Sequence, residues 1–70
     1  MPNMIPVSSS NLVSVGYDPS TQSLYIQFRT GLYVYSGVPE PVYTGLMNAS
    51  SHGTYHAKYI KNHYPYRKIG

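Results

Sequence analysis

The chain has 70 residues, with five Lys or Arg against two Asp or Glu and no cysteine. A chain this short forms one domain at most and buries only about 60% of its unfolded surface, and without cysteine neither a disulfide nor a zinc–thiolate site can add to its core. No stretch approaches the roughly 20 apolar residues that cross a bilayer, and residues 1–7 lack the features of a signal peptide. We therefore expect a cytoplasmic protein without membrane contact that gains buried area as a homo-oligomer.

The positive charge is concentrated near the end of the chain. Four of the five basic residues lie within the last thirteen positions, and both acidic residues precede them. This region should attract anions, or it forms a solvated basic tail that keeps the protein soluble. The nine tyrosines are a second unusual feature, because tyrosine suits half-buried sites and interfaces.

The first half of the chain predicts a β-meander. Asp18-Pro19-Ser20-Thr21-Gln22 and Thr30-Gly31 have the chemistry of turns. Between them the chain alternates apolar and polar residues, which predicts three antiparallel strands. These strands are residues 12–17, 23–29 and 32–36, after an irregular lead-in at residues 1–7.

The register of this meander follows from the turns. If Thr30-Gly31 is a two-residue hairpin turn, Phe28 lies opposite Tyr33. Across the first turn, Tyr17 pairs with Leu24. Residues opposite one another share a face, and one face is then almost wholly apolar. Its members are Val13, Val15, Tyr17, Leu24, Ile26, Phe28, Tyr33 and Tyr35.

The second half predicts two short helices. Pro39-Glu40-Pro41 suits a first helical turn, and apolar residues follow at helical spacing, although Gly45 weakens this helix. A second helix should begin near Ser50 or Ser51, which are good N-caps, and end before Pro65, leaving residues 65–70 as an irregular basic tail. The predicted fold is α+β, in the order βββαα, with both helices packed on the apolar face of the sheet.

In their order and spacing, the sequence motifs resemble the KTSC domain family. They are Ser9-Ser10-Asn11, Gly16-Tyr17-Asp18, Leu24-x-Ile26-x-Phe28, Tyr33-x-Tyr35, Val38-Pro39, Val42-Tyr43-x-x-Leu46, Ser51-x-Gly53-x-Tyr55 and Ile60. The resemblance covers residues 8–64 and implies one small α+β domain without an assigned biochemical role. The family forms the C-terminal extension of some lysyl-tRNA synthetases and also stand-alone bacterial and phage proteins, a context that suggests RNA binding by association only.

One position departs from the family pattern. The family usually has a second aromatic residue and then Asn after the aromatic at Tyr55, whereas this chain has His56 and Ala57. If that Asn belongs to a common ligand site, the site is lost or altered here.

The start of the second predicted helix is a candidate phosphate site. Its residues are Ser50, Ser51, His52, Gly53 and Thr54. Free N–H groups and the helix dipole favour an anion at such a position, and the hydroxyls and the glycine suit a phosphate. The alternative is an ordinary N-cap, in which a serine bonds its own helix.

The same helix carries further candidates. His52, His56 and His63 fall on one helical stripe, but without an acid or cysteine beside them we expect no metal. His56 is retained as a ligand-binding candidate. Lys58 and Lys61 fall on the opposite side, where they either contact phosphate or face water.

The sheet offers one more candidate surface. The two tyrosines of the third strand share the apolar face and should pack in the core rather than stack on bases. Tyr25 and Arg29 lie on the other face, where they could form an exposed stacking surface. The alternative is a surface that pairs with another subunit through Leu32 and Val34.

Together these features predict a non-catalytic binding module without a cofactor. Only Asp18 and Glu40 could serve as carboxylate acid–base groups, and no nucleophile motif is present. The expected ligand is a phosphorylated nucleotide, either a small nucleotide or RNA, and in a phage such a binder could act as an anti-defence sponge for a signalling nucleotide. The alternatives are a protein-interaction or homo-oligomerisation module and, third, a hydrolase that depends on His52.

Overall fold

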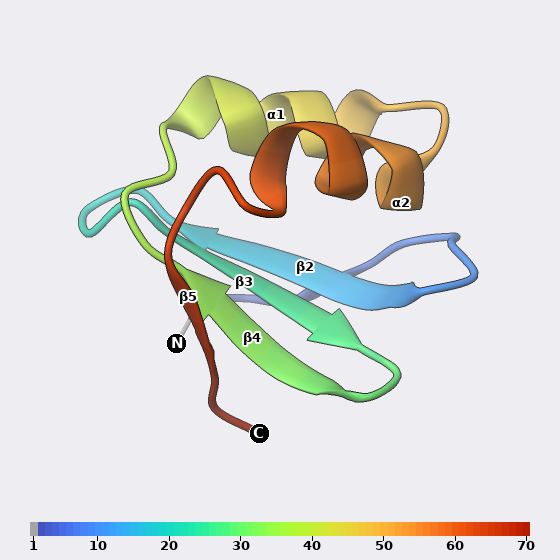
Figure 1. Ribbon diagram of the computed structural model, residues 1–70, viewed down its shortest axis with the longest axis horizontal. Helices are drawn as coiled ribbons and strands as arrows, with labels where there is room; N and C mark the ends of the chain where they lie inside the picture. The colour runs from blue at the N-terminus through green and yellow to red at the C-terminus, as the bar shows by residue number, and fades with distance from the viewer. Residues whose placement is uncertain (1) are drawn as a thin grey trace.

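Five antiparallel strands and a helical layer make up the structure, a computed structural model that describes residues 2–70. The strands follow one another across the sheet in chain order, and the helices cover one face (Figure 1). The strands are β1 (Ile5–Pro6), β2 (Leu12–Asp18), β3 (Ser23–Phe28), β4 (Gly31–Tyr35) and β5 (Tyr66–Lys68). The helical segments are α1 (Glu40–Asn48), α2 (His52–Tyr55) and the π-helical turn η1 (His56–Ile60). The α+β class is confirmed, but the sheet has two strands more than predicted.

The pairing of β2 with β3 is the predicted one, except at its start. Tyr17 lies opposite Leu24. A β-bulge between Leu12 and Ser14 then shifts the register. The extra residue turns Leu12 into the core and leaves Val13 42% exposed. The assignment of Val13 to the apolar face is therefore wrong.

The pairing of β3 with β4 differs from the prediction by two residues. The turn is residues 29–30, so that Phe28 lies opposite Gly31 and Ile26 lies opposite Tyr33. Gly31 has a φ of 153° and belongs to the strand, where a Cβ would lie 2.6 Å from the carbonyl oxygen of Gly70. Because side chains alternate with a period of two, a shift of two residues keeps each residue of β3 and β4 on its predicted face. The apolar face predicted for these strands is therefore correct although their register is not.

Both ends of the chain were predicted to be irregular, and both predictions are wrong in part. Residues 5–6 of the lead-in pair with β2, and the tail forms β5 along the free edge of β4. The amide of Leu32 donates to the carbonyl of Gly70 (3.0 Å), and the amide of Ile69 donates to the carbonyl of Leu32 (2.8 Å). The tail thus satisfies backbone groups that β4 would otherwise expose.

The helices begin as predicted, but the second ends early. In α1 a proline occupies the first turn and Glu40 is its acidic residue. Ser51 caps α2, which lasts a single turn. The chain then widens into η1, closed by a hydrogen bond from the amide of Lys61 to the carbonyl of His56 (2.8 Å). It does not run helically to Pro65.

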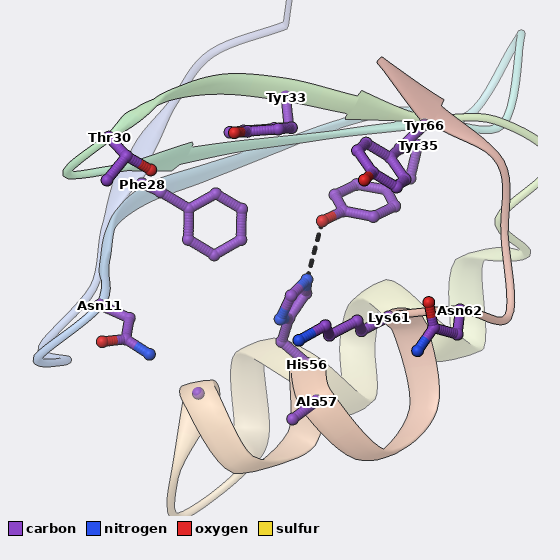
Figure 2. A pocket seen from close by; sticks show the side chains of 11 residues that line it. Asn11, Phe28, Thr30, Tyr33, Tyr35, His56, Ala57, Lys61, Asn62 and Tyr66 are labelled. Carbon is purple, nitrogen blue, oxygen red and sulfur yellow. Dashed lines mark hydrogen bonds between the residues drawn. The ribbon is translucent and has the colours of Figure 1, made fainter. Parts of the chain in front are cut away.

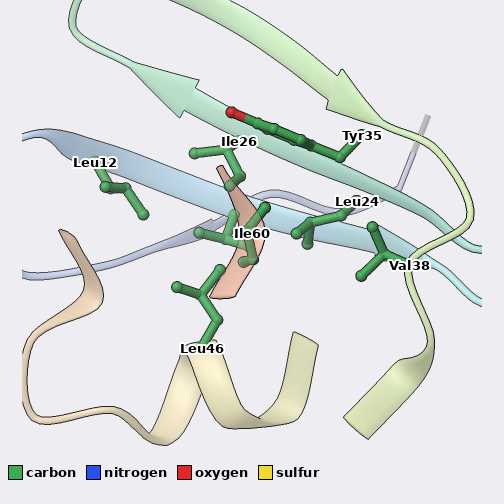
Figure 3. Close-up of a cluster of buried hydrophobic side chains, with 8 residues drawn as sticks. Leu12, Leu24, Ile26, Tyr35, Val38, Leu46 and Ile60 are labelled. Atoms are coloured by element: carbon green, nitrogen blue, oxygen red, sulfur yellow. The ribbon is translucent and has the colours of Figure 1, made fainter. Parts of the chain in front are cut away.

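The core lies between the sheet and the helices (Figure 3). Leu46 of α1 and Ile60 of η1 are both 0% exposed and face the buried residues of the sheet. Each such side chain contributes about 1.5–3 kcal/mol. The predicted packing of the helices on the apolar sheet face is confirmed. The buried cluster is Leu12, Val15, Leu24, Ile26, Tyr35, Val38, Leu46 and Ile60.

Candidate functional site

A groove of about 310 Å³ opens between β3–β4–β5 and the α2–η1 segment (Figure 2). Its sheet side consists of aromatic rings, and its helical side carries polar groups. Asn11 and Thr30 lie at one end. The volume falls at the small end of the usual range for small-molecule sites, roughly 300–1,000 Å³.

Five aromatic rings of this groove form a closed circuit. The centroids of Phe28 and Tyr33 are 5.4 Å apart, those of Tyr33 and Tyr66 5.8 Å, and those of Tyr66 and Tyr35 5.5 Å. Tyr35 is 5.6 Å from His56, which in turn lies 5.0 Å from Phe28. These spacings are typical of attractive aromatic pairs, so that each ring is held by two others.

The fold explains how the circuit assembles. Phe28, Tyr33 and Tyr35 occupy alternate positions on the helix-facing side of two paired strands. Tyr66 lies opposite Tyr35 in the β4–β5 pair and adds its ring from the neighbouring strand. His56 closes the circuit from the first residue of η1.

His56 is bound to the sheet by its side chain. Its Nε2 atom and the hydroxyl of Tyr35 share a hydrogen bond of 2.8 Å. Burial, and to a lesser degree the charge of Lys61, lower the pKa of His56, while burial raises the pKa of Tyr35 to about 12. At neutral pH both groups are therefore uncharged. A neutral imidazole has one donor and one acceptor, so it can still bond to a ligand.

The π-helical turn brings Lys61 to the same side as His56. In an α-helix, residues five positions apart point about 140° away from one another. Here the hydrogen bond from the amide of Lys61 to the carbonyl of His56 places them one turn apart, and the Lys61 amine lies beside the imidazole (Figure 2). The prediction that Lys61 lies opposite the histidines is therefore wrong, because it assumed α-helical geometry. π-turns are frequent at functional sites.

Asn62 follows Lys61 and ends the helical segment. Its φ is 66°, a left-handed conformation that asparagine tolerates better than most residues. Its side chain lines the groove. The groove thus holds an amide group beside its lysine and its histidine.

The predicted phosphate site at the start of α2 is instead an ordinary N-cap. The Ser51 hydroxyl accepts from the Thr54 amide (3.3 Å) and donates to the Thr54 hydroxyl (2.9 Å). Nδ1 of His52 bonds to the carbonyl of Leu46 (2.8 Å). Of the five predicted residues only Gly53 lines the groove, and Ser50 lies outside it.

The remaining predicted residues are dispersed. The Lys58 amine lies 5.9 Å from the ring of Tyr59, outside the groove. Tyr25 lines a separate hollow. Arg29 lines a further hollow next to the groove, and its Nε atom donates to the carbonyl of Ser10 (2.8 Å). Tyr25 and Arg29 therefore do not share one stacking surface.

Sequence reasoning missed most of the rings. It assigned Phe28, Tyr33 and Tyr35 to the core. Tyr35 is buried there, whereas Phe28 and Tyr33 are half-buried against it, and all three also line the groove. It left Tyr66 in an irregular tail. The tail offered a compositional signal rather than a periodic one: Tyr66 and Ile69 are good strand formers and flank two basic residues, as is common on an edge strand.

Two classes of site find no support in the part of the chain that is described. Within residues 2–70, no three histidine, cysteine or acidic side chains gather as a metal would require. No helix among these residues has the length and apolarity to span a membrane.

Comparisons with known proteins agree with the motifs. The KTSC domain model matches residues 8–64. An uncharacterized protein of Stutzerimonas stutzeri is 40% identical over 67 residues, which cover 93% of this chain and 94% of that protein. A lysine–tRNA ligase of Nostoc sp. is 41% identical over 54 residues, but the match covers only 10% of the ligase.

A solved structure extends this agreement to the fold. The crystal structure of a KTSC domain protein from Yersinia pestis has 45% sequence identity and a TM-score of 0.97, and the match covers 100% of both chains. The family resemblance of the sequence motifs is confirmed. The chain belongs to the KTSC domain family.

Proposed function

We propose that the groove binds a small phosphorylated nucleotide, with the base against the aromatic circuit and the phosphate near Lys61 and His56. The observation that supports this proposal is the circuit of five rings next to a lysine in one concave site. Stacking of a base on an aromatic side chain is worth about 1–3 kcal/mol and tolerates any base. The amide of Asn62 and the hydroxyl of Thr30 add hydrogen-bonding groups.

The charges near the groove favour an anion. No carboxylate lies among the groove's lining residues, all of which fall within residues 2–70. The two acidic residues lie near a different ring, that of Tyr17. Burial raises the pKa of Tyr17 most, and the negative charges of Glu40 and then Asp18 raise it further. The Tyr17 ring stacks on Tyr43 of α1. Aromatic rings also bind quaternary ammonium ions, but the ammonium group of Lys61 would repel such a ligand.

RNA presents the same chemistry as a small nucleotide. The match to part of a lysine–tRNA ligase keeps RNA as a candidate source of the base and phosphate. The small volume of the groove favours a compact ligand over a long strand. Binding without turnover would suit sequestration of a signalling nucleotide, the role that an anti-defence sponge of a phage performs.

Calorimetric titration with nucleoside 5′-monophosphates, nucleosides, inorganic phosphate and tetramethylammonium tests the proposal. We expect monophosphates to bind and Lys61→Gln to weaken them about tenfold, while nucleoside binding changes little. Tyr66→Leu should weaken both, because it removes a stacking ring. Lys58→Gln is the matched control, since Lys58 lies outside the groove.

Chromatography of the titrated mixture separates binding from catalysis. We expect every nucleotide to be recovered unchanged, whereas turnover that is lost in His52→Ala would support the hydrolase alternative. If no nucleotide binds at millimolar concentration, or if tetramethylammonium binds more tightly than any nucleotide, the proposed function is wrong.

A further inference from the structure

A second hollow, of about 410 Å³, adjoins the groove at the β3–β4 turn. Its lining is Asn11, Phe28, Arg29 and Thr30. All of these except Arg29 also line the groove, so the two hollows meet at the three shared residues. Figure 2 shows these three at the end of the groove away from Lys61.

Arg29 is fixed in place by contacts that leave most of its guanidinium free. Its Nε atom donates to the carbonyl of Ser10 (2.8 Å), and its backbone amide donates to the carbonyl of Asn11 (3.3 Å). The guanidinium has five N–H groups, and the contact with Ser10 uses one of them. The four others, on the two terminal nitrogens, are not used by this contact and can bond a ligand.

The combined groove therefore has a cation on each side of its aromatic surface. Lys61 stands on the helical side next to His56, and Arg29 follows Phe28 at the turn. The rings of Phe28 and His56 are 5.0 Å apart between these two cations. A single phosphate at Lys61 would leave the charge of Arg29 without an anionic partner.

We propose that the ligand is a nucleoside phosphorylated on both its 3′ and 5′ oxygens, with one phosphate at Lys61 and the other at Arg29. The guanidinium fork of arginine matches the oxygens of a phosphate. Phosphates on both sides of one nucleoside occur in a free bisphosphate, in a linear or cyclic dinucleotide and in RNA. The inference rests on the proposed function, because it adds a second phosphate subsite to the same groove.

The test compares adenosine 5′-monophosphate, adenosine 3′-monophosphate and adenosine 3′,5′-bisphosphate on the full chain by calorimetry. We expect the bisphosphate to bind at least about tenfold more tightly than either monophosphate. Arg29→Gln should abolish that advantage and change the affinity of the Lys61-bound monophosphate less than about twofold. Arg29→Lys, which keeps the charge but not the fork, should retain part of it.

The matched control is Arg67→Gln, because Arg67 lines a different hollow. Thermal unfolding of each variant verifies that it folds. Equal affinity of monophosphate and bisphosphate, or an equal loss in Arg67→Gln and Arg29→Gln, would overturn the second subsite while leaving the proposed function standing. If no nucleotide binds, both the second subsite and the proposed function are wrong.

Two further ligands identify the source of the nucleoside. A cyclic dinucleotide and a decameric RNA are titrated with the same variants. If the affinity for either ligand depends on Arg29, the result supports the second subsite and identifies that ligand as the source of the nucleoside. Binding of both without dependence on Arg29 would contradict it.

Discussion

His56 links the site to the stability of the fold. Burial and the charge of Lys61 lower its pKa below the ordinary value of 6.5, so the folded chain binds fewer protons than the unfolded chain at mildly acidic pH. The contribution of neutral His56 is complete above pH 6.5 and decreases as the pH falls towards its lowered pKa. The sequence marked His56 as a candidate, but nothing in it indicated Tyr35 as the partner.

We expect the free energy of unfolding to be lower at about pH 5.5 than at about pH 7.5 for this reason. Urea unfolding at the two pH values measures the difference. His56→Phe keeps an aromatic ring next to Phe28 and should show a smaller difference, whereas His63→Gln, at an exposed position, should behave as the parent. If the parent and both variants show the same pH dependence, the change in stability arises from titratable groups other than His56.

Gly45 has a role that helix propensity does not reveal. From the sequence it merely weakens α1. In the structure, a Cβ at this position would lie 2.8 Å from Cζ of Tyr55 and closer still to the hydroxyl. Gly45 therefore lets α2 approach α1, and its absence of a side chain is a packing requirement.

Gly45→Ala should accordingly destabilise the protein. Helix propensity alone would stabilise it by about 1 kcal/mol, but overpacking costs about 1–3 kcal/mol, and the contact with the rigid Tyr55 ring makes overpacking dominate. The control is Gly53→Ala, whose Cβ would meet Asn11 at an ordinary 3.7 Å. Chemical denaturation compares the two, and a more stable Gly45→Ala protein would show that Tyr55 moves aside freely.

At the scale of the elements, the sequence predicted what periodicity controls. Three central strands, the apolar face of the sheet except at Val13, and the starts of both helices follow from alternation, turn chemistry and capping. The two outer strands were missed because strands of two and three residues are too short to display a pattern. Their pairing depends on the edges that the central strands leave open.

The two other errors have the same origin. Thr30-Gly31 has the composition of a two-residue turn, but Gly31 belongs to β4. A glycine is needed at this position because the carbonyl of Gly70 lies too close for a side chain. The π-turn has no sequence signature, and it moved Lys61 into the groove. The candidate site was therefore recognisable only in part, since it depends on contacts between the sheet, η1 and the tail.

The tail strand provides a test of this long-range pairing. The amides of Leu32 and Ile69 make hydrogen bonds across β4 and the tail, and we expect their hydrogen exchange to be slow. Antiparallel alternation places the amide of Arg67 toward β4 and that of Lys68 toward solvent. Arg67→Pro should therefore abolish this protection and weaken nucleotide binding through release of Tyr66.

Lys68→Pro is the matched control for that experiment. A proline whose missing N–H would face solvent is tolerated on an edge strand, so it should preserve both protection and binding. Fast exchange at Leu32 and Ile69 in the parent chain would instead favour an irregular tail.

At the scale of the whole molecule, charge is unevenly distributed. Asp18 and Glu40 both act on Tyr17, beside the β2–β3 turn, while Arg29 and Lys61 flank the groove. Anions should therefore be attracted to the groove. For RNA, a rise from about 50 to about 200 mM salt should reduce affinity about threefold for each phosphate neutralised.

A small nucleotide held mainly by stacking should lose less than RNA over the same range. Titrations at the two salt concentrations measure this, and a steep dependence with a monophosphate would show that charge rather than stacking dominates binding.

Homo-oligomerisation stays a prediction. The surface first considered for it includes Val34, which a single chain already buries to 8% exposure, and Leu32, which the tail contacts. Light scattering on the parent and on Leu32→Glu measures the assembly. If the parent chain is monomeric at high concentration, Tyr25, Leu32 and Val34 do not form an oligomer interface.

The two outermost strands have a consequence for how much of the protein a cell can hold. Both are short and exposed, and they carry Pro6 on one side and Arg67 and Lys68 on the other. Short length, proline and charge each hinder the addition of a strand from another chain, so the sheet resists growth into aggregates. The sequestration proposed above would require the protein to match its ligand mole for mole, and such edges would favour accumulation to that level without precipitation.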